Sequence, residues 1–169
     1  MIHIHSTAAS GAEAAVVKFM NSWVGNFYKL IAFTPRERFN DIGPLGDIKG
    51  KIIESHATRI ESANIDAIKN SDCAIIYKIG RHPPSVKNTI KRCRGNNVNY
   101  HFINEMNHDD MISACKWICE NNFSNIFITG PRSSERPDAE ASFRPIVGDL
   151  LSYIYIYFIW GEGIWQKRT

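Results

Sequence analysis

The sequence predicts an α/β protein built on a mainly parallel, doubly wound sheet. The first observation is that short, strand-like apolar runs alternate with stretches of helical periodicity along most of the chain. Alternation of this kind implies right-handed crossovers between parallel strands. The second observation is the length of 169 residues, which allows one domain with a proper core. Because no repeat, low-complexity linker or domain boundary interrupts the chain, we expect residues 1–169 to form a single domain.

The apolar runs and helical patterns place each element of this fold in turn. Five strands are predicted, at Ile2–His5, Tyr28–Phe33, Cys73–Ile79, Val98–Ile103 and Asn125–Thr129. Helices are predicted between them, at Gly11–Val24, Thr58–Asn70, Ser85–Arg94 and His108–Asn122, and a last helix begins near Asp138. The helix over 108–122 has the clearest pattern, with Asn107 or Asp109 as its N-cap and an apolar stripe of Met111, Ile112, Cys115, Ile118 and Cys119.

Two regions interrupt the alternation. Residues 34–56 read as a loop rich in proline, glycine and charge, longer than an ordinary connection and therefore of functional interest. In the tail, tyrosines at 153, 155 and 157 alternate with apolar residues, which indicates either an added strand or an aromatic extension of the last helix. We treat residues 152–169 as an aromatic C-terminal extension. An exposed surface of this kind seeks a partner, so we expect a homo-oligomer.

Composition favours a soluble cytoplasmic protein. The chain has four cysteines, Cys73, Cys93, Cys115 and Cys119, and they show no CxxC spacing. Three of the four lie in apolar or amphipathic stretches, as reduced cysteine does in the cytosol. The sequence shows no cleavable leader. The longest apolar run, Ile154–Trp160, is too short to span a bilayer, so no membrane partner is expected.

Charge is unevenly distributed. The net charge of +3 does not by itself indicate nucleic-acid binding, but residues 78–94 carry six basic residues and no acid. Contact with nucleic acid is one interpretation, and it predicts binding that weakens steeply with salt. Aromatic residues are nearly absent from the segment, so it offers no platform for base stacking. We therefore do not expect nucleic acid as the partner.

The most informative segment is Phe127–Ser134, in which an apolar strand ends in a turn that carries an arginine and hydroxyl groups. Ligands of open α/β sheets bind beyond the carboxyl ends of the strands. Backbone N–H groups, hydroxyls and the forked guanidinium of Arg132 can hold a phosphate or another oxyanion there. The alternative is an ordinary strand-to-helix turn, shaped by Gly130 and Pro131, with a solvated Arg132.

Two further strand ends resemble ligand-binding turns. The first strand runs into Ser6–Glu13, small residues that open a helix whose N-terminus favours negative charge. Small residues are also what any tight turn of this type prefers. The turn over residues 80–85 is basic and follows the third strand, but Pro83 and Pro84 remove two N–H donors.

No catalytic motif is evident. His3 and His5 share a strand face without a third ligand, so no metal site is predicted. The chain has no GxSxG elbow, no P-loop lysine motif and no HExxH pair. Four acids lie nearest the predicted site, each open to a role as a capping or solvated carboxylate: Glu13, Asp41, Glu61 and Glu135. The catalytic residues therefore stay unknown.

Four segments together carry a resemblance to a known family. They are Thr7-Ala8-Ala9-Ser10-Gly11-Ala12-Glu13, the loop from Thr34-Pro35-Arg36 to Gly43-Pro44-Leu45, the pair Arg59-Ile60-Glu61 and Ser71-Asp72, and Gly130-Pro131-Arg132-Ser133-Ser134. Over most of residues 1–151 the chain resembles the putative molybdenum carrier family, whose last motif is Gly-Pro-Arg-Glu-Ser. The resemblance implies a Rossmann-like three-layer sandwich with a mainly parallel sheet of five to six strands.

The resemblance also implies a ligand, and two departures bear on its size. The family's first turn is Gly-Gly-Gln-Thr-Gly-Ala-Asp, so this chain keeps the end of that motif and lacks its first glycines. The family's Gly-Gly-Thr turn after the third strand is replaced by Pro83-Pro84-Ser85, which loses the close backbone approach of glycine. A smaller or differently shaped ligand than the family name suggests is therefore expected.

The function expected from these residues is a binding or carrier protein for a small phosphorylated ligand, either molybdenum cofactor or a nucleotide derivative. A protein that sequesters a signalling nucleotide is one alternative. A nucleotide N-glycoside hydrolase with Glu13 or Glu61 as base is another. The ligand-binding residues expected are Thr7, Ser10, Gly11, Arg36, Arg38, Arg81, Ser85, Gly130, Pro131, Arg132, Ser133 and Ser134.

Overall fold

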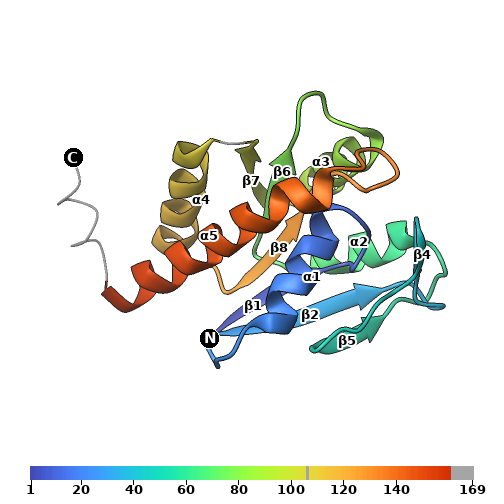
Figure 1. Ribbon diagram of the computed structural model, residues 1–169, viewed down its shortest axis with the longest axis horizontal. Coiled ribbons are helices and arrows are strands. Elements are labelled where there is room, and N and C mark those ends of the chain that lie inside the picture. Colours follow the sequence, from blue (N-terminus) through green and yellow to red (C-terminus); the bar gives the residue numbers. More distant parts are fainter. Residues whose placement is uncertain (106, 161–169) are drawn as a thin grey trace.

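The computed structural model describes residues 1–105 and 107–160, and its centre is a six-stranded parallel sheet (Figure 1). The strands run in the order β5-β2-β1-β8-β6-β7. Their bounds are β1 Ile2–Ser6, β2 Tyr28–Thr34, β5 Lys51–Glu54, β6 Cys73–Lys78, β7 Asn99–Asn104 and β8 Asn125–Thr129. Every neighbouring pair in this sheet is parallel. The predicted α/β class and parallel sheet are confirmed.

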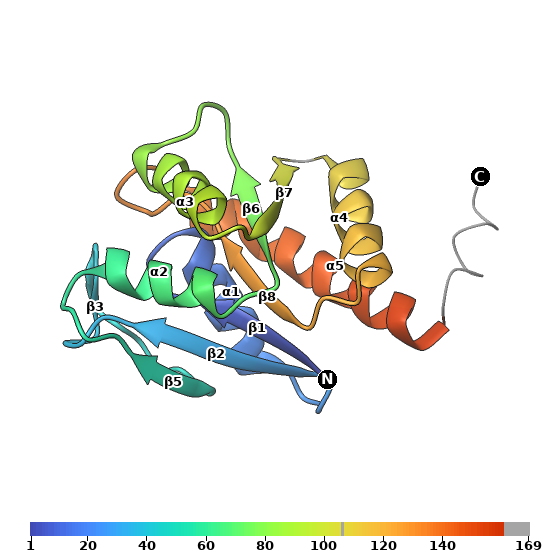
Figure 2. The same cartoon turned by 180° about the vertical axis from the view of Figure 1, so that it is seen from behind.

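Helices cover both faces of the sheet, which makes three layers. Their bounds are α1 Ala12–Ser22, α2 Ile60–Lys69, α3 Pro84–Gly95, α4 His108–Glu120 and α5 Ala139–Trp160. One face carries α1, α4 and α5 (Figure 1), and the opposite face carries α2 and α3 (Figure 2). All five predicted helices are confirmed. Asn107 is the N-cap of α4, where its side chain accepts hydrogen bonds from the N–H groups of Asp109 and Asp110.

The region read as a loop over residues 34–56 contains more structure than predicted. A short antiparallel hairpin, β3 (Phe39–Asn40) with β4 (Gly43–Pro44), is followed by the edge strand β5, which pairs with β2. Four residues with charged ends carry too little apolar pattern to mark a strand, so β5 was missed. The strand conformation of β5 is stabilised by its pairing with β2, although its own sequence does not favour a strand.

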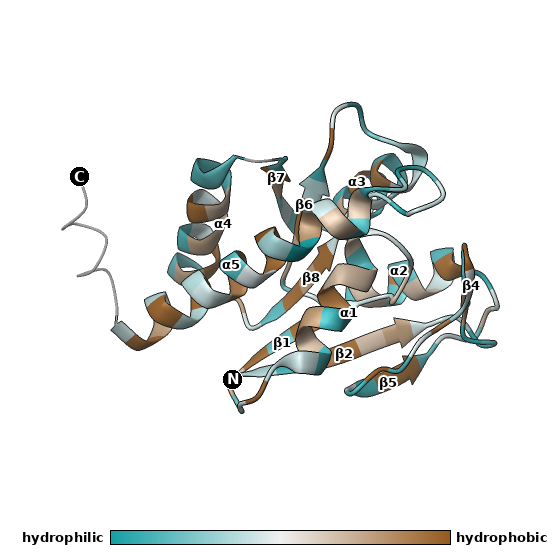
Figure 3. Cartoon of the chain, in the orientation of Figure 1, coloured by the Kyte–Doolittle hydropathy of each residue, from teal (hydrophilic) through white to brown (hydrophobic). Residues whose placement is uncertain are grey.

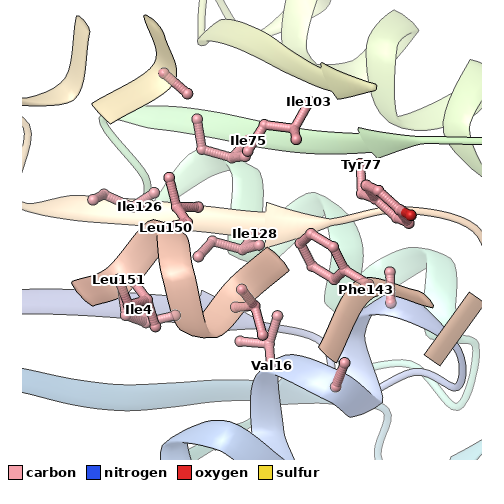
Figure 4. Close-up of a cluster of buried hydrophobic side chains, with 14 of the residues drawn as sticks. Ile4, Val16, Ile75, Tyr77, Ile103, Ile126, Ile128, Phe143, Leu150 and Leu151 are labelled. Carbon is pink, nitrogen blue, oxygen red and sulfur yellow. The ribbon is translucent and has the colours of Figure 1, made fainter. Parts of the chain in front are cut away.

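The larger core lies between the sheet and the helices α1, α4 and α5. Ile4 and Ile128 from the central strands meet Val16 of α1 and Leu150 of α5 in this layer (Figure 4). The rings of Tyr77 and Phe143 stack with centroids 4.4 Å apart, which holds the start of α5 against β6. In Figure 3 the helices α4 and α5 show alternating hydrophobic and hydrophilic bands, as expected of helices with one face on the core. This core fixes the strand ends from which the site is built.

The tail is helical as far as the structure describes it. Helix α5 runs through Trp160, so the helical alternative is confirmed over residues 152–160 and the strand alternative is wrong there. Residues 161–169 of the predicted extension lie outside the described residues. No helix in the described part of the chain is long and apolar enough to cross a membrane.

The connections after β8 and β6 leave the sheet on opposite faces. Strand β8 leads to α5 on one face, whereas β6 leads to α3 on the other. Where adjacent parallel strands diverge in this way, a crevice opens beyond their carboxyl ends, and ligands of open α/β sheets bind there. The topology therefore directs attention to the ends of β8 and β6 and of their neighbour β1.

Candidate functional site

The turns after β1 and β8 pack directly on each other. The N–H of Ala12 donates to the carbonyl of Pro131 at 3.0 Å. Gly11 has a φ of +71°, and a Cβ there would lie 2.2 Å from the Pro131 oxygen. A Cβ on Gly130 would lie 2.8 Å from that of Ala12. Both glycines are therefore required by this close approach, which brings the two strand ends together as one wall of the site.

A small polar cavity lies beside this wall, with a volume of about 140 Å³. It is bounded by the ends of β1 and β8, the first turns of α3 and the start of α2. Its lining residues are Thr7, Glu13, Glu61, Asn64, Pro84, Ser85, Asn88, Thr89, Arg92, Thr129, Gly130, Arg132 and Glu135. A larger hollow of about 600 Å³ lies along the edge strand β7, by Arg94, Tyr100 and Trp117. We place the site at the smaller cavity because guanidinium and carboxyl groups from several elements converge on it.

Two arginines reach the cavity from different elements. Arg132, from the turn after β8, lies 3.4 Å from the Glu61 carboxylate of α2. Arg92, from α3, donates to the amide oxygen of Asn64 at 2.9 Å. Burial lowers the pKa of Arg92 and the nearby Glu61 carboxylate opposes that shift, but within the described residues this guanidinium forms no ion pair closer than 4.0 Å. A half-buried guanidinium without a carboxylate partner is a natural receptor for an anionic group.

Glu13, in the first turn of α1, is buried at the base of the cavity. Its carboxyl group accepts hydrogen bonds from the hydroxyls of Thr7 and Thr129. The N–H groups of Thr7 and Ala9 also donate to it, at 3.2 and 3.3 Å. Burial raises the pKa of Glu13, and these hydrogen bonds and the nearby Arg132 oppose that shift without cancelling it. The group ties the ends of β1 and β8 to α1.

Asp41, from the hairpin loop, binds the turn that precedes α1 and the turn after β8. Its carboxylate accepts hydrogen bonds from the hydroxyls of Ser10 and Ser134, each at 2.6 Å. The N–H groups of the same two serines donate to it at 3.3 Å. Burial by itself would raise the pKa of Asp41, but the hydrogen bonds outweigh burial and lower it. An internal carboxylate thus links the turns that follow β1 and β8.

Glu135 binds the N-terminal turn of α3 through its carboxylate. Its carboxylate accepts a hydrogen bond from the N–H of Ser85 at 2.9 Å and another from the Ser85 hydroxyl. Pro84 stands at the first helical position, so the N–H of Ser85 is among the first free donors of this helix. Asp41 thus binds the turn before α1 and Glu135 binds the first turn of α3, whereas the two guanidinium groups point into the cavity as its charged donors.

The structure brings some of the predicted binding residues together and separates others. Thr7, Ser85, Gly130 and Arg132 line the cavity. Gly11 and Pro131 build its wall through the contact between the two turns. Ser10, Ser133 and Ser134 belong to the Asp41 network, in which the N–H of Ser133 donates to the Ser10 hydroxyl at 2.9 Å. Arg36, Arg38 and Arg81 are exposed and do not line the cavity.

Sequence reasoning missed five polar lining residues: Asn64, Asn88, Thr89, Arg92 and Thr129. The hydroxyl of Thr89 accepts from the Asn64 amide at 3.4 Å, so Asn64 links α3 to α2 beside Arg92. A signal for the α3 residues existed. Ser85, Asn88, Thr89 and Arg92 follow the spacing of one helical face, which makes a polar stripe on a helix that is expected to pack on a sheet.

No group of three or more histidine, cysteine or acidic side chains in the described ranges is arranged to hold a metal ion. The cysteines are all buried and free. Charge in the cavity is therefore set by its own acids and arginines.

Comparison with known proteins identifies the family. Residues 2–151 match the model of the circularly permutated YpsA SLOG family. The chain belongs to this family. Its fold is similar to the crystal structure of a putative molybdenum carrier protein from Syntrophus aciditrophicus SB, with a TM-score of 0.74 and 16% sequence identity over 91% of this chain and 94% of that one. A search of curated proteins finds no match. The resemblance drawn from the four sequence segments is thereby confirmed, and the structural likeness extends it to the fold.

Proposed function

We propose that the chain binds a small phosphorylated ligand, nucleotide-derived or similar to molybdenum cofactor, with its anionic group held between Arg92 and Arg132. The observation that carries this proposal is Arg92. Its guanidinium is partly desolvated, bonded to a neutral amide and directed to the same cavity as Arg132. An incoming phosphate supplies the missing negative charge through charge-assisted hydrogen bonds. It also competes with Glu61 for Arg132, since that ion pair is long and partly exposed.

The cavity limits how the ligand binds. Its volume of about 140 Å³ is well below the ~300–1,000 Å³ of a pocket that encloses a drug-sized molecule. It accommodates one phosphate or a comparable charged end, and the rest of the ligand extends beyond the strand ends. Exposed Arg36 and Arg38, on the segment before the hairpin, would contact that outer part. The family relationship and the carrier neighbour are consistent with a small-molecule ligand of this kind.

The first experiment is to denature the purified protein and identify the released small molecule by mass spectrometry. A pterin derivative supports the carrier function, whereas a cyclic or ADP-ribose-type nucleotide supports sequestration of a nucleotide. The compound is then titrated into ligand-free protein by calorimetry. Since one charge-assisted hydrogen bond contributes about 1.5–3 kcal/mol, Arg92→Ala and Arg132→Ala should each weaken binding about tenfold to a hundredfold.

Arg94→Ala is the matched control because it removes the same charge from the same helix, at a residue that contacts Tyr100 outside the cavity. It should leave the affinity unchanged. Unchanged binding by both Arg92→Ala and Arg132→Ala would show that the ligand does not bind here.

A second candidate function is hydrolysis of an N-glycosidic bond in a nucleotide. It is favoured by the presence of Glu13 and Glu61 in the same cavity, because the raised pKa of Glu13 keeps a proton available beside the ion-paired Glu61. Incubation with a panel of nucleotides, followed by chromatography, tests it. Hydrolysis is supported if the parent chain releases free base and Glu61→Gln does not. If the nucleotides bind and stay unchanged, the chain only binds its ligand.

A further inference from the structure

Helix α5 continues beyond the part of the chain that defines the family. The family match ends at residue 151, yet α5 runs on to Trp160, away from the sheet (Figure 1). Residues 152–160 contain no charged side chain. A helical segment that is apolar on most sides is normally covered by other protein. This segment is therefore an addition to the ligand-binding fold with its own requirement for a partner.

The exposed face of this segment is an aromatic stripe. Ser152, Tyr155, Phe158 and Ile159 are exposed and follow the spacing of one helical face. Trp160 is 68% exposed at the end of the described helix. We call Tyr155, Phe158, Ile159 and Trp160 the α5 patch.

The α5 patch rests on a support from the first part of the chain. The ring of Tyr155 lies 5.0 Å from that of Phe27 and 6.0 Å from that of Trp23, and Phe158 lies 5.9 Å from Phe27. Val24, next to Trp23 in the chain, is 97% exposed and adds to the apolar surface. Edge-to-face packing of this kind fixes the aromatic rings, so little side-chain entropy is lost when a partner covers them.

From this surface we infer that the α5 patch pairs with the same patch of a second copy of this chain about a two-fold axis. A patch without charge leaves no charge unpaired when it meets itself. It also lacks the lysine and arginine residues that attract a helix to an anionic membrane surface. Taking a large aromatic side chain as ~200 Å², the exposed parts of the patch and Val24 amount to about 500 Å² per copy. Two copies bury about 1,000 Å², the lower limit of a specific interface, so we expect a weak dimer whose population rises with concentration.

The test is sedimentation velocity of the full chain over a concentration series. The parent chain should shift from one to two chains per particle as concentration rises, and Ile159→Lys combined with Trp160→Lys should weaken dimerisation at least tenfold. Ile42→Lys is the matched control, because Ile42 is also an exposed apolar residue, 66% exposed, on the β3–β4 hairpin. It should dimerise like the parent chain.

Both substituted residues are half-exposed or more, so circular dichroism should show an unchanged fold in the double variant. A parent chain that stays monomeric at all concentrations overturns the proposal, as does a double variant that dimerises like the parent. Flotation of the monomeric parent chain with phosphatidylcholine vesicles would assign the patch to a membrane surface and equally overturn it.

Discussion

Glu13 offers the sharpest test of the structural reasoning, because its carboxyl group is buried and yet surrounded by hydrogen-bond donors. Burial raises its pKa above the ordinary value of 4.5. A group whose pKa is raised in the folded state gives its full contribution to stability below its unfolded pKa. That contribution is lost as pH rises toward the folded-state value. Across this window the folding equilibrium constant should fall roughly tenfold per pH unit on account of this one residue.

Glu13→Gln removes this titration while keeping the shape of the protonated side chain. The amide oxygen takes the position that accepts from Thr7 and Ala9. The NH₂ group takes the position that accepts from the Thr129 hydroxyl in the parent, so in the variant that hydroxyl has to turn and accept instead. Near pH 4.5 the variant should match the parent within about 1 kcal/mol, the worth of one rearranged hydrogen bond. As pH rises above 4.5, its stability relative to the parent should increase.

Urea denaturation followed by tryptophan fluorescence, at four or five pH values, measures this difference. Glu13→Ala is the companion variant. It leaves the donors of Thr7, Ala9 and Thr129 without their acceptor, at about 1 kcal/mol for each of four hydrogen bonds, and should cost about 4 kcal/mol. A constant difference between Glu13→Gln and the parent across the pH range, or a growing loss of stability of the variant as pH rises, would refute the raised pKa of Glu13.

Three further predictions follow from the packing. Asp41→Ala should lower the free energy of unfolding by about 2 kcal/mol at pH 7, since four hydrogen bonds from Ser10 and Ser134 are lost. Because the pKa of Asp41 is lowered in the fold, the parent loses this advantage as pH falls below 3.8, so the two unfolding curves should converge in acid. Gly130→Ala should destabilise the protein by about 1–3 kcal/mol, because the new methyl group would collide with Ala12 and Tyr77. Gly95→Ala is the control: nothing lies within 4 Å of its new methyl group, so thermal melts should show a neutral or slightly stabilising effect. Equal effects of the two substitutions would contradict the packing of the two turns. The four cysteines are buried, and burial raises the pKa of Cys93 to about 11. A thiol reagent at pH 8 should therefore label them only in denaturant, and rapid labelling of the native protein would count against this core.

The sheet and helices were largely predictable from local pattern. Each of the five predicted strands and five predicted helices appears within a few residues of its expected bounds. Buried strands such as Cys73–Lys78 are apolar on both faces, and the α4 stripe has a clear N-cap at Asn107, so local sequence and tertiary packing favour the same structure. Strand β5 was missed because an edge strand of four residues depends on its neighbour.

The tail shows a different limit. Tyrosine and apolar residues alternate over 153–158, and this period of two is equally compatible with a strand. In the structure Ile154 is buried against α1 and α4 within a continuous helix, so packing against neighbouring helices decides the conformation.

The candidate site was only partly predictable for a related reason. The Gly130-Pro131-Arg132 turn and the small-residue turn at Ser10 and Gly11 are visible in the sequence, because strand ends and helix starts are local features. Which carboxylate pairs with which donor is not local: Asp41 reaches Ser134 across 93 residues of chain, and Glu135 reaches Ser85 across 50.

The sequence by itself determined the α/β class, the strand ends that face the site and the family to which the chain belongs. Only the tertiary structure decided that Asp41 bonds to Ser10 and Ser134 and Glu135 to Ser85, and that Arg92 lines the cavity with no ion pair closer than 4.0 Å among the described residues. The physical reason is that hydrophobic periodicity is set by each element's own contact with the core. Pairing of charges, in contrast, depends on how elements distant in sequence approach one another once that core has formed.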